Sequence, residues 1–343
     1  MDCEGAWLVD PGILIDIQNL HTNFYLREGV VKAVNGASLT IAKGRTLGVV
    51  GESGCGKSVT AQSILQIVPR PGRIESGDIL LHIAESDLDE TINITDLNPG
   101  DPLMRDIRGS RISMIFQEPM TSFSPVHTVG NQLEETIKLH QPERRDEAPA
   151  RVLDMLRRVG IANPERNVEA YPHQLSGGMR QRAMVAMALM LEPSLLIADE
   201  PTTALDVTTE AQILALMRDM QSQLHMAIMF ITHDLGVIAE MADDVAVMYL
   251  GRVVEKAPVR AIFHSPKHPY LQALLESIPR IQKRSGARLK AIEGVVPNPL
   301  DVPSGCPFHL RCPDFIPGVC DEVVPADTPV DEGHTVACHL YTD

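Results

Sequence analysis

The segment that most restricts the fold of this chain runs from Gly51 to Ser58 and reads Gly-Glu-Ser-Gly-Cys-Gly-Lys-Ser. It follows a short apolar run at 46–50 and precedes a helix-like stretch at 59–67. Glycines at this spacing let the backbone curl until successive N–H groups face one anion, and the following helix adds its positive end. A strand, this loop and a helix in that order predict a phosphate-binding loop.

Within the predicted loop, Lys57 would place its ammonium group against the β- and γ-phosphates of a nucleotide, and the Ser58 hydroxyl would ligate Mg²⁺. Cys55 is interpreted as a small residue that the loop tolerates, with a reactive thiol as the alternative. The residues expected to contact the nucleotide here are Gly51, Ser53, Gly54, Cys55, Gly56, Lys57 and Ser58.

The rest of the apolar pattern predicts the fold class. Short apolar runs that read as buried strands lie at 46–50, 111–115, 195–198, 226–231 and 245–249. They alternate with helix-like stretches such as 209–224, whose apolar residues form one stripe at helical spacing. This alternation is typical of an α/β protein with a parallel sheet covered on both faces. Residues 118–192 contain no strand-like run and predict a helical insertion.

An apolar run ends in two carboxylates, Asp199 and Glu200. In a parallel sheet, ligands gather at the carboxyl ends of the strands, where these side chains would emerge. Asp199 suits the Mg²⁺ shell, through water, because Mg²⁺ retains several waters. Glu200 suits a base that polarises the attacking water. Together with the phosphate loop, the pair predicts a nucleoside triphosphatase.

A second predicted anion site is Ser176-Gly177-Gly178, which precedes a helix expected at 181–191. A serine and two glycines at a helix start expose free backbone N–H groups to an anion. A chain with two phosphate-binding helix starts can serve two nucleotides, each shared with a partner chain.

With these motifs together, residues 13–255, roughly, resemble the ATPase subunit of an ATP-binding-cassette (ABC) transporter. Six elements match in order: the loop 51–58, Gln117 in Phe-Gln-Glu-Pro at 116–119, Ser176-Gly177-Gly178, the strand ending in Asp199 and Glu200, Ala204-Leu205-Asp206, and His233 in Ile-Thr-His-Asp at 231–234. The resemblance implies a P-loop NTPase of ABC type, with a parallel-sheet core, a helical subdomain at about 118–192 and an N-terminal β-subdomain.

The resemblance also implies roles for single residues. Two subunits would clamp two ATP molecules head to tail, with the phosphate loop of one facing Ser176, Gly177 and Gly178 of the other. The further expected roles are Mg²⁺ and γ-phosphate sensing by Gln117, a contact across the dimer by Asp206, a hydrogen bond to the γ-phosphate by His233, and adenine stacking by Phe24.

The net charge of the chain restricts the classes of partner that it can bind. The formal net charge is −15 and the isoelectric point is about 5.2. This balance argues against nucleic acid as a partner, because a nucleic-acid footprint needs clustered positive charge. The longest strongly apolar stretch, 183–191, is far shorter than a bilayer span of ~20 residues. The N-terminus lacks the pattern of a secretory signal, so we expect an intracellular chain whose membrane role depends on a partner.

Four of the six cysteines, Cys306, Cys312, Cys320 and Cys338, lie in a proline-rich tail with eight acidic side chains and one arginine. Their spacing matches neither zinc knuckles nor bacterial ferredoxins, so the residues by themselves indicate only a plausible four-thiolate site. Free or disulfide-bonded cysteines are the alternative. Six prolines preclude a long helix in this tail.

Residues around these cysteines, such as Gly-Cys-Pro-Phe at 305–308 and Arg-Cys-Pro at 311–313, resemble the C-terminal extension of oligopeptide/dipeptide importer ATPases. That resemblance implies a 4Fe-4S cluster held by the four cysteines. Zinc is the alternative, with His309, His334 or His339 as stand-in ligands.

The resulting expectation is an ABC ATPase domain at 1–260 and a four-cysteine extension at 261–343. The chain would hydrolyse ATP with Mg²⁺ in a sandwich dimer with an identical or paralogous ATPase. It would power peptide import through two permease subunits, at the cytoplasmic face of the membrane, with an extracytoplasmic peptide-binding protein as an indirect partner. A different cargo (a metal chelate or glutathione) and a non-transport ABC ATPase are the alternatives.

Overall fold

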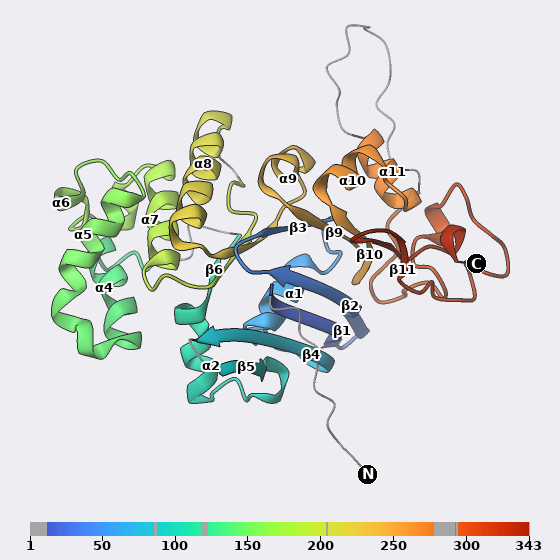
Figure 1. The fold of residues 1–343 in the computed structure, drawn as a ribbon, viewed down its shortest axis with the longest axis horizontal. Coiled ribbons are helices and arrows are strands. Elements are labelled where there is room, and N and C mark those ends of the chain that lie inside the picture. Colours follow the sequence, from blue (N-terminus) through green and yellow to red (C-terminus); the bar gives the residue numbers. More distant parts are fainter. Residues whose placement is uncertain are drawn as a thin grey trace, which may run out of the picture.

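The structure is a computed structural model, and it describes residues 12–85, 88–117, 123–203, 205–277, 292 and 294–342. Two sheets organise these residues (Figure 1). The first is an antiparallel sheet with the strand order β2-β1-β4-β5. Its strands are β1 (Ile13–Leu26), β2 (Gly29–Ala42), β4 (Gly72–Glu85) and β5 (Leu88–Asn93). This sheet is the N-terminal β-subdomain that the resemblance implied.

The second sheet has eight strands in the order β11-β12-β10-β9-β3-β8-β7-β6. Five consecutive strands of this sheet, from β9 to the edge strand β6, are parallel to one another: β3 (Thr46–Val50), β6 (Ile112–Ile115), β7 (Leu195–Asp199), β8 (Ala227–Ile231) and β9 (Asp244–Tyr249). All five are apolar runs that the sequence predicts as strands. The parallel core of the predicted α/β fold is therefore confirmed.

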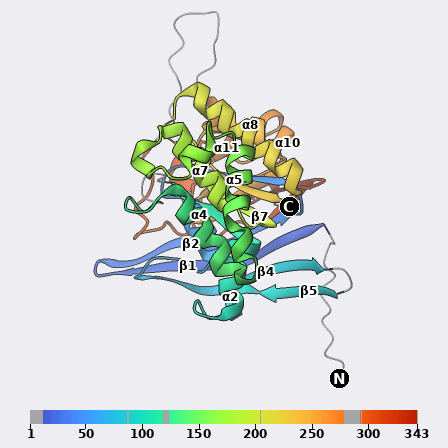
Figure 2. The ribbon, with the colours of Figure 1, turned by 90° about the vertical axis from the view of Figure 1, so that its left-hand side faces the viewer.

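Helices pack on this sheet. They are α1 (Lys57–Ile64), α8 (Val207–Leu224), α9 (Leu235–Met241), α10 (Val259–His264) and α11 (Pro269–Glu276). The short helix α2 (Pro102–Asp106) lies instead beside β4 and β5 of the four-stranded sheet (Figure 1). Between β6 and β7 the described residues form helices and no strand: α4 (Val129–His140), α5 (Ala148–Arg158), α6 (Pro164–Asn167), α7 (Gly177–Leu189) and short 3₁₀ turns. Figure 2 shows this helical group above the layer formed by the four-stranded sheet.

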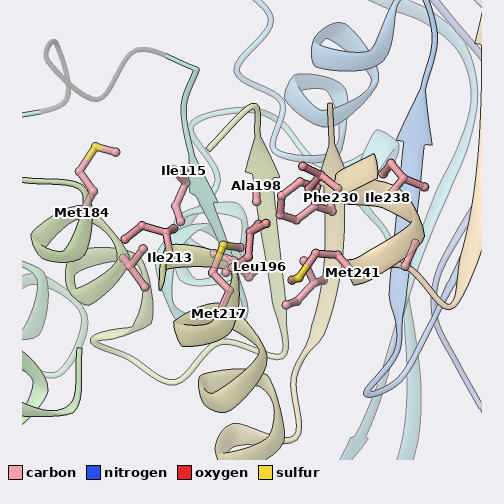
Figure 3. Close-up of a cluster of buried hydrophobic side chains, with 14 of the residues drawn as sticks. Ile115, Met184, Leu196, Ala198, Ile213, Met217, Phe230, Ile238 and Met241 are labelled. Carbon is pink, nitrogen blue, oxygen red and sulfur yellow. The ribbon is translucent and has the colours of Figure 1, made fainter. Parts of the chain in front are cut away.

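The five parallel strands are buried on both faces, and alternate residues of one strand enter different cores. Leu196 and Ala198 of β7 face the core that contains α7 and α8, together with Ile213 and Met217 (Figure 3). Leu195 and Ile197 belong to the other core, which includes residues of β1 and β2. A strand with two buried faces has no polar position, which explains the continuous apolar runs.

The C-terminal extension joins the same sheet. The hairpin strands β11 (Thr328–Asp331) and β12 (His334–Val336) follow the cysteine-rich loops, and β12 pairs antiparallel with β10 (Arg252–Pro258). As expected from its prolines, the described tail contains only short 3₁₀ turns as helical structure. The sheet thus continues across residue 260, and the domain boundary there stays a prediction.

Candidate active site

The phosphate loop connects β3 to α1 in the predicted setting. Gly51 has φ 154°, and a Cβ there would lie 2.2 Å from the carbonyl oxygen of Met248. Gly56 is the N-cap of α1 with φ 103°, and a Cβ there would lie 2.3 Å from the carbonyl oxygen of Ala33. Only glycine fits such close backbone approaches. The loop is therefore held in one curled conformation by sterics at both ends.

Lys57 points back into this loop. Its buried ammonium group donates to the carbonyl oxygens of Gly51, at 2.7 Å, and Glu52, at 3.1 Å. Ser53 and Gly54 at the loop tip are exposed, whereas Cys55 is buried. Burial raises the pKa of the Cys55 thiol, with Lys57 opposing that shift. Cys55 therefore fits the packing interpretation better than the reactive-thiol one.

Ser58 and Asp199 form a pair of oxygen donors suited to Mg²⁺. The Ser58 hydroxyl donates to Oδ1 of Asp199 at 3.0 Å. Burial raises the pKa of Asp199, and the hydrogen bond from Ser58 and the charge of Lys57 counteract this. A hydroxyl and a buried carboxylate at the edge of a phosphate loop are hard donors of the kind that Mg²⁺ selects.

Glu200 collects three polar side chains around its carboxylate. Oε2 accepts hydrogen bonds from Gln117, at 3.2 Å, and from Thr203, at 3.0 Å, and Oε1 lies 3.2 Å from Nδ1 of His233. Partial burial alone would raise the pKa of Glu200, but the hydrogen bonds from His233 and Thr203 lower it overall. Glu200 is thus held as a carboxylate that can accept a proton or polarise water.

Strand topology explains this convergence. Gln117, Glu200 and His233 follow β6, β7 and β8, which are adjacent and parallel, so their carboxyl ends open on one edge. The backbone N–H of Glu200 also donates to the carbonyl of Ile231 at 2.9 Å, which ties the ends of β7 and β8 together.

The Ser-Gly-Gly segment lies in a different place. Ser176 is the N-cap of α7, and its hydroxyl accepts from the N–H of Met179 at 3.3 Å. Ser176, Gly177, Gly178 and Asp206 line one hollow of about 450 Å³, and no residue of the loop 51–58 is among its described lining. A Cβ at Gly177 would meet open space. These four residues are brought together, apart from the phosphate loop of the same chain.

The four C-terminal thiols are free and lie near one another. Cys306, Cys320 and Cys338 are buried, and the N–H of Cys306 donates to the carbonyl of Cys320 at 2.7 Å. Burial, reinforced by the charges of neighbouring thiols, raises the pKa of Cys306 and of Cys312 to about 11. Across the described ranges, no three His, Cys, Asp or Glu side chains are grouped closely enough to hold a metal ion.

The histidines considered for zinc have other partners. His309 Nδ1 lies 2.8 Å from the carbonyl oxygen of Cys306, and His339 Nε2 lies 2.8 Å from that of Val323. His334 Nε2 lies 2.8 Å from Oε1 of the buried Glu255. Each has one ring nitrogen engaged, His309 and His339 with the extension itself and His334 with Glu255 of β10.

Comparison with known proteins now identifies the family. The chain is 49% identical over 327 residues, covering 95% of this chain and 94% of the relative, to the probable peptide ABC transporter ATP-binding protein y4tR of Sinorhizobium fredii. The chain belongs to the ABC transporter ATP-binding protein family. The family described as "ABC transporter" matches residues 34–203, and that described as "Oligopeptide/dipeptide transporter, C-terminal region" matches residues 254–320.

A second relative of this ABC ATPase is the dipeptide transport ATP-binding protein DppD of Bacillus subtilis, 47% identical over 95% of this chain and 94% of the relative. Among solved structures, the dimeric bacterial ABC transporter cassette MJ0796 superimposes with a TM-score of 0.60 and 26% identity over 72% of this chain and 99% of that one. The predicted family, the P-loop NTPase fold and the ATPase activity are thereby confirmed.

Not every expected residue of the ABC ATPase is placed in the site. The Phe24 ring packs closely against Gly72 in the four-stranded sheet, and its contact with adenine stays a prediction. Glu118, Pro119 and Ala204 lie outside the described residues. Within the described part of the chain, no helix has the length and apolar character needed to cross a bilayer.

Two features of the site were missed from the sequence. Thr203 binds Glu200, and Glu52 of the phosphate loop pairs with Arg311 of the extension. Thr203 lies only three residues after Glu200, so the sequence spacing could have suggested a hydrogen bond between the two side chains. Nothing local in the sequence connects Glu52 with Arg311.

Proposed function

We propose that this chain is the ATP-hydrolysing subunit of a peptide importer, attached to membrane permease subunits at the cytoplasmic face. The observation that carries the proposal is the combination of a complete hydrolytic edge, with Lys57, Asp199, Glu200 and His233, and an extension matching the oligopeptide/dipeptide transporter region at 254–320. The names of the relatives, which concern peptide and dipeptide transport, support the same cargo.

The hydrolytic step uses the chain's own residues in stated roles. Lys57 would turn from the loop carbonyls to the β- and γ-phosphates. Ser58 and Asp199 would hold Mg²⁺, which would neutralise charge on the phosphates. Glu200 polarises the attacking water, while His233 and Gln117 orient it and the γ-phosphate.

Each ATP is completed by a second cassette. Ser176, Gly177 and Gly178 expose a helix start to a hollow rather than to their own phosphate loop, and Asp206 lines the same hollow. A helix start that faces away from its own phosphate loop is placed to bind the γ-phosphate of a partner's nucleotide. The dimeric cassette among the structural neighbours supports this arrangement.

The permease docks in an apolar groove between the helical group and the sheet core. This groove has a volume of about 350 Å³, and its lining includes Ile112, Phe116, Thr136, Met184 and Met187. Phe116 precedes Gln117, so a helix seated here would sense the residue that contacts Glu200. A movement of Gln117 during ATP hydrolysis would therefore be transmitted through Phe116 to a permease helix bound in the groove.

For the four cysteines we propose a 4Fe-4S cluster, whose binding would draw the thiols closer together than they lie in the described structure. The chemistry of the donors suits such a cluster: the thiols are free and near one another, and in a tail with eight acidic side chains four thiolates would repel one another unless a cation neutralised them. When bound, the cluster would supply a covalent cross-link between the loops around Cys306, Cys312, Cys320 and Cys338.

Anaerobic purification tests this centre. A brown protein with absorbance at about 400 nm, and loss of that absorbance in Cys312→Ser, is the expected result. A colourless protein with stoichiometric zinc would replace the iron assignment, and a metal-free protein would contradict the proposal altogether.

Uptake into liposomes tests the proposed function. The chain is reconstituted with its permease pair, partner ATPase and peptide-binding protein, and uptake of labelled di- and oligopeptides is measured with ATP inside. Glu200→Gln should abolish ATP-driven uptake and lower hydrolysis by about 10²- to 10⁴-fold while ATP binding persists. Uptake of a metal chelate or glutathione, and not of peptides, would contradict the peptide assignment.

A further inference from the structure

The C-terminal extension contacts the phosphate loop directly through one arginine. Arg311 lies in the 3₁₀ turn His309–Arg311, next to Cys312, and its guanidinium group donates to both carboxylate oxygens of Glu52. The distances are 2.7 Å from Nη1 to Oε2 and 3.1 Å from Nη2 to Oε1. The pair spans 259 residues of sequence and joins the two regions matched by different families.

The surroundings make this pair rigid. The Arg311 side chain is only 4% exposed, and it lies near the rings of Tyr249 and Phe308, with its central carbon 5.8 Å and 5.9 Å from their centroids. Nη1 of Arg311 also lies 3.3 Å from the Tyr249 hydroxyl. A bidentate pair with a buried guanidinium is geometrically specific, and removing one partner leaves a charge without compensation.

The loop backbone is held from the same side. The N–H of Glu52 donates to the hydroxyl oxygen of Tyr270 at 2.9 Å, and Tyr270 packs on Tyr249 and Phe308. The carbonyl of Glu52 accepts from Lys57, the residue expected to bind the nucleotide phosphates. Side chain, N–H and carbonyl of this one residue thus connect the extension to the catalytic lysine.

From this geometry we propose that Arg311 is a positioning residue for ATP binding: through Glu52 it holds the phosphate loop in its nucleotide-binding conformation. The C-terminal extension thereby sets the affinity of the chain for ATP. A loop already held in its binding conformation loses less conformational freedom when the phosphates enter, and ATP binding is correspondingly tighter. The inference deepens the nucleotide site and rests on the proposed role of the loop in binding ATP.

The test is a double-mutant cycle on the purified full-length chain, read out with a fluorescent ATP analogue. Arg311→Met and Glu52→Gln should each weaken binding by about tenfold, within the usual range for coupled sites. The double variant should bind no more weakly than either single variant, because both remove the same interaction. Arg311→Lys, which keeps the charge without the planar fork, should recover part of the affinity.

Thermal unfolding without nucleotide separates positioning from stability. Arg157→Met is the matched control, because Arg157 forms an exposed ion pair with Glu165 in the helical group. If Arg311→Met lowers the melting temperature but the folded protein binds the analogue like the wild type, the proposal fails. Additive effects in the cycle would also overturn it, since Glu52 would then act on ATP independently of Arg311.

Glu52→Gln keeps the test decisive if Arg311→Met does not fold, because the Glu52 side chain is 25% exposed and a glutamine amide oxygen can still accept one hydrogen bond from the buried Arg311. Unchanged affinity in this variant overturns the proposal. Failure of the wild-type chain to bind the analogue would instead refute the nucleotide site itself.

Discussion

Glu200 contributes to the site through its backbone as well as its carboxylate. It is a non-glycine residue with φ 47°, in the left-handed region that L-residues rarely adopt. The backbone turns sharply here, directly after β7, and the N–H of Glu200 bonds to the end of β8. Such a conformation persists only where the surroundings over-determine it, and it aims the carboxylate at Gln117 and His233.

His268 gives a residue-scale prediction about pH. It is 1% exposed and caps α11 by accepting from the N–H of Tyr270 at 3.0 Å, and burial lowers its pKa from 6.5 to about 3. The His268 imidazole is therefore protonated near pH 6.5 in the unfolded chain but only near pH 3 in the folded chain. Between these values, acid destabilises the fold by about 1.4 kcal/mol per pH unit from this group.

His268→Asn keeps a capping acceptor and removes the titration. Urea unfolding at pH values above and below 6.5 should show that the wild type loses more stability on acidification than this variant does. Identical pH slopes for the two proteins would contradict the burial argument.

At the scale of the elements, the order of β6, β7 and β8 builds the hydrolytic edge. Continuous apolar runs made these strands predictable, and Asp199 and Glu200 could be assigned to the ligand-binding edge because they follow a strand of a parallel sheet. Gln117 and His233 were expected in the site only from the family resemblance. The four-stranded sheet was expected only from the resemblance, because β1 and β2 mix buried and exposed positions with bulges that blur any alternation. Pairing of Arg311 with Glu52 depends on tertiary packing, so no local pattern predicts it.

The groove beside α7 gives an element-scale prediction. Met187 is half-buried in its lining, so Met187→Glu places a charge where the permease helix is proposed to sit. We expect loss of co-purification with the permease, while the ATP affinity of the isolated chain stays within about twofold of wild type. Leu139→Glu is the control, because Leu139 is 71% exposed on α4 and does not line the groove. Retained complex in Met187→Glu would argue against this docking site.

At the scale of the whole molecule, the proposed function assigns to one chain two halves of different nucleotide sites. The phosphate loop and the Glu200 cluster form one half, and the hollow at Ser176 and Asp206 forms the other. If this assignment is right, neither half encloses a nucleotide alone, and each site is completed only when a second cassette binds.

Ser176→Arg tests that division. In the Glu200→Gln variant, a dimer should accumulate when ATP is added, and light scattering coupled to size-exclusion chromatography should detect it. Adding Ser176→Arg should prevent dimer formation, because the arginine side chain fills the hollow. Binding of ATP to the monomer should persist, because Ser176 lies apart from its own phosphate loop. A dimer that still forms in the double variant would show that the Ser-Gly-Gly segment does not face the partner's nucleotide.

The pairing of β12 with β10 has a consequence for shortened forms of this protein. Glu255 and Lys256 of β10 pair with Val336 and Thr335 of β12. Strand β12 therefore satisfies backbone hydrogen-bond donors and acceptors of β10 that would otherwise lie at the edge of the sheet. A version truncated before β11 would leave them bare, as a template for strands from other molecules. Such a truncation should therefore self-associate and precipitate, even with its catalytic residues intact.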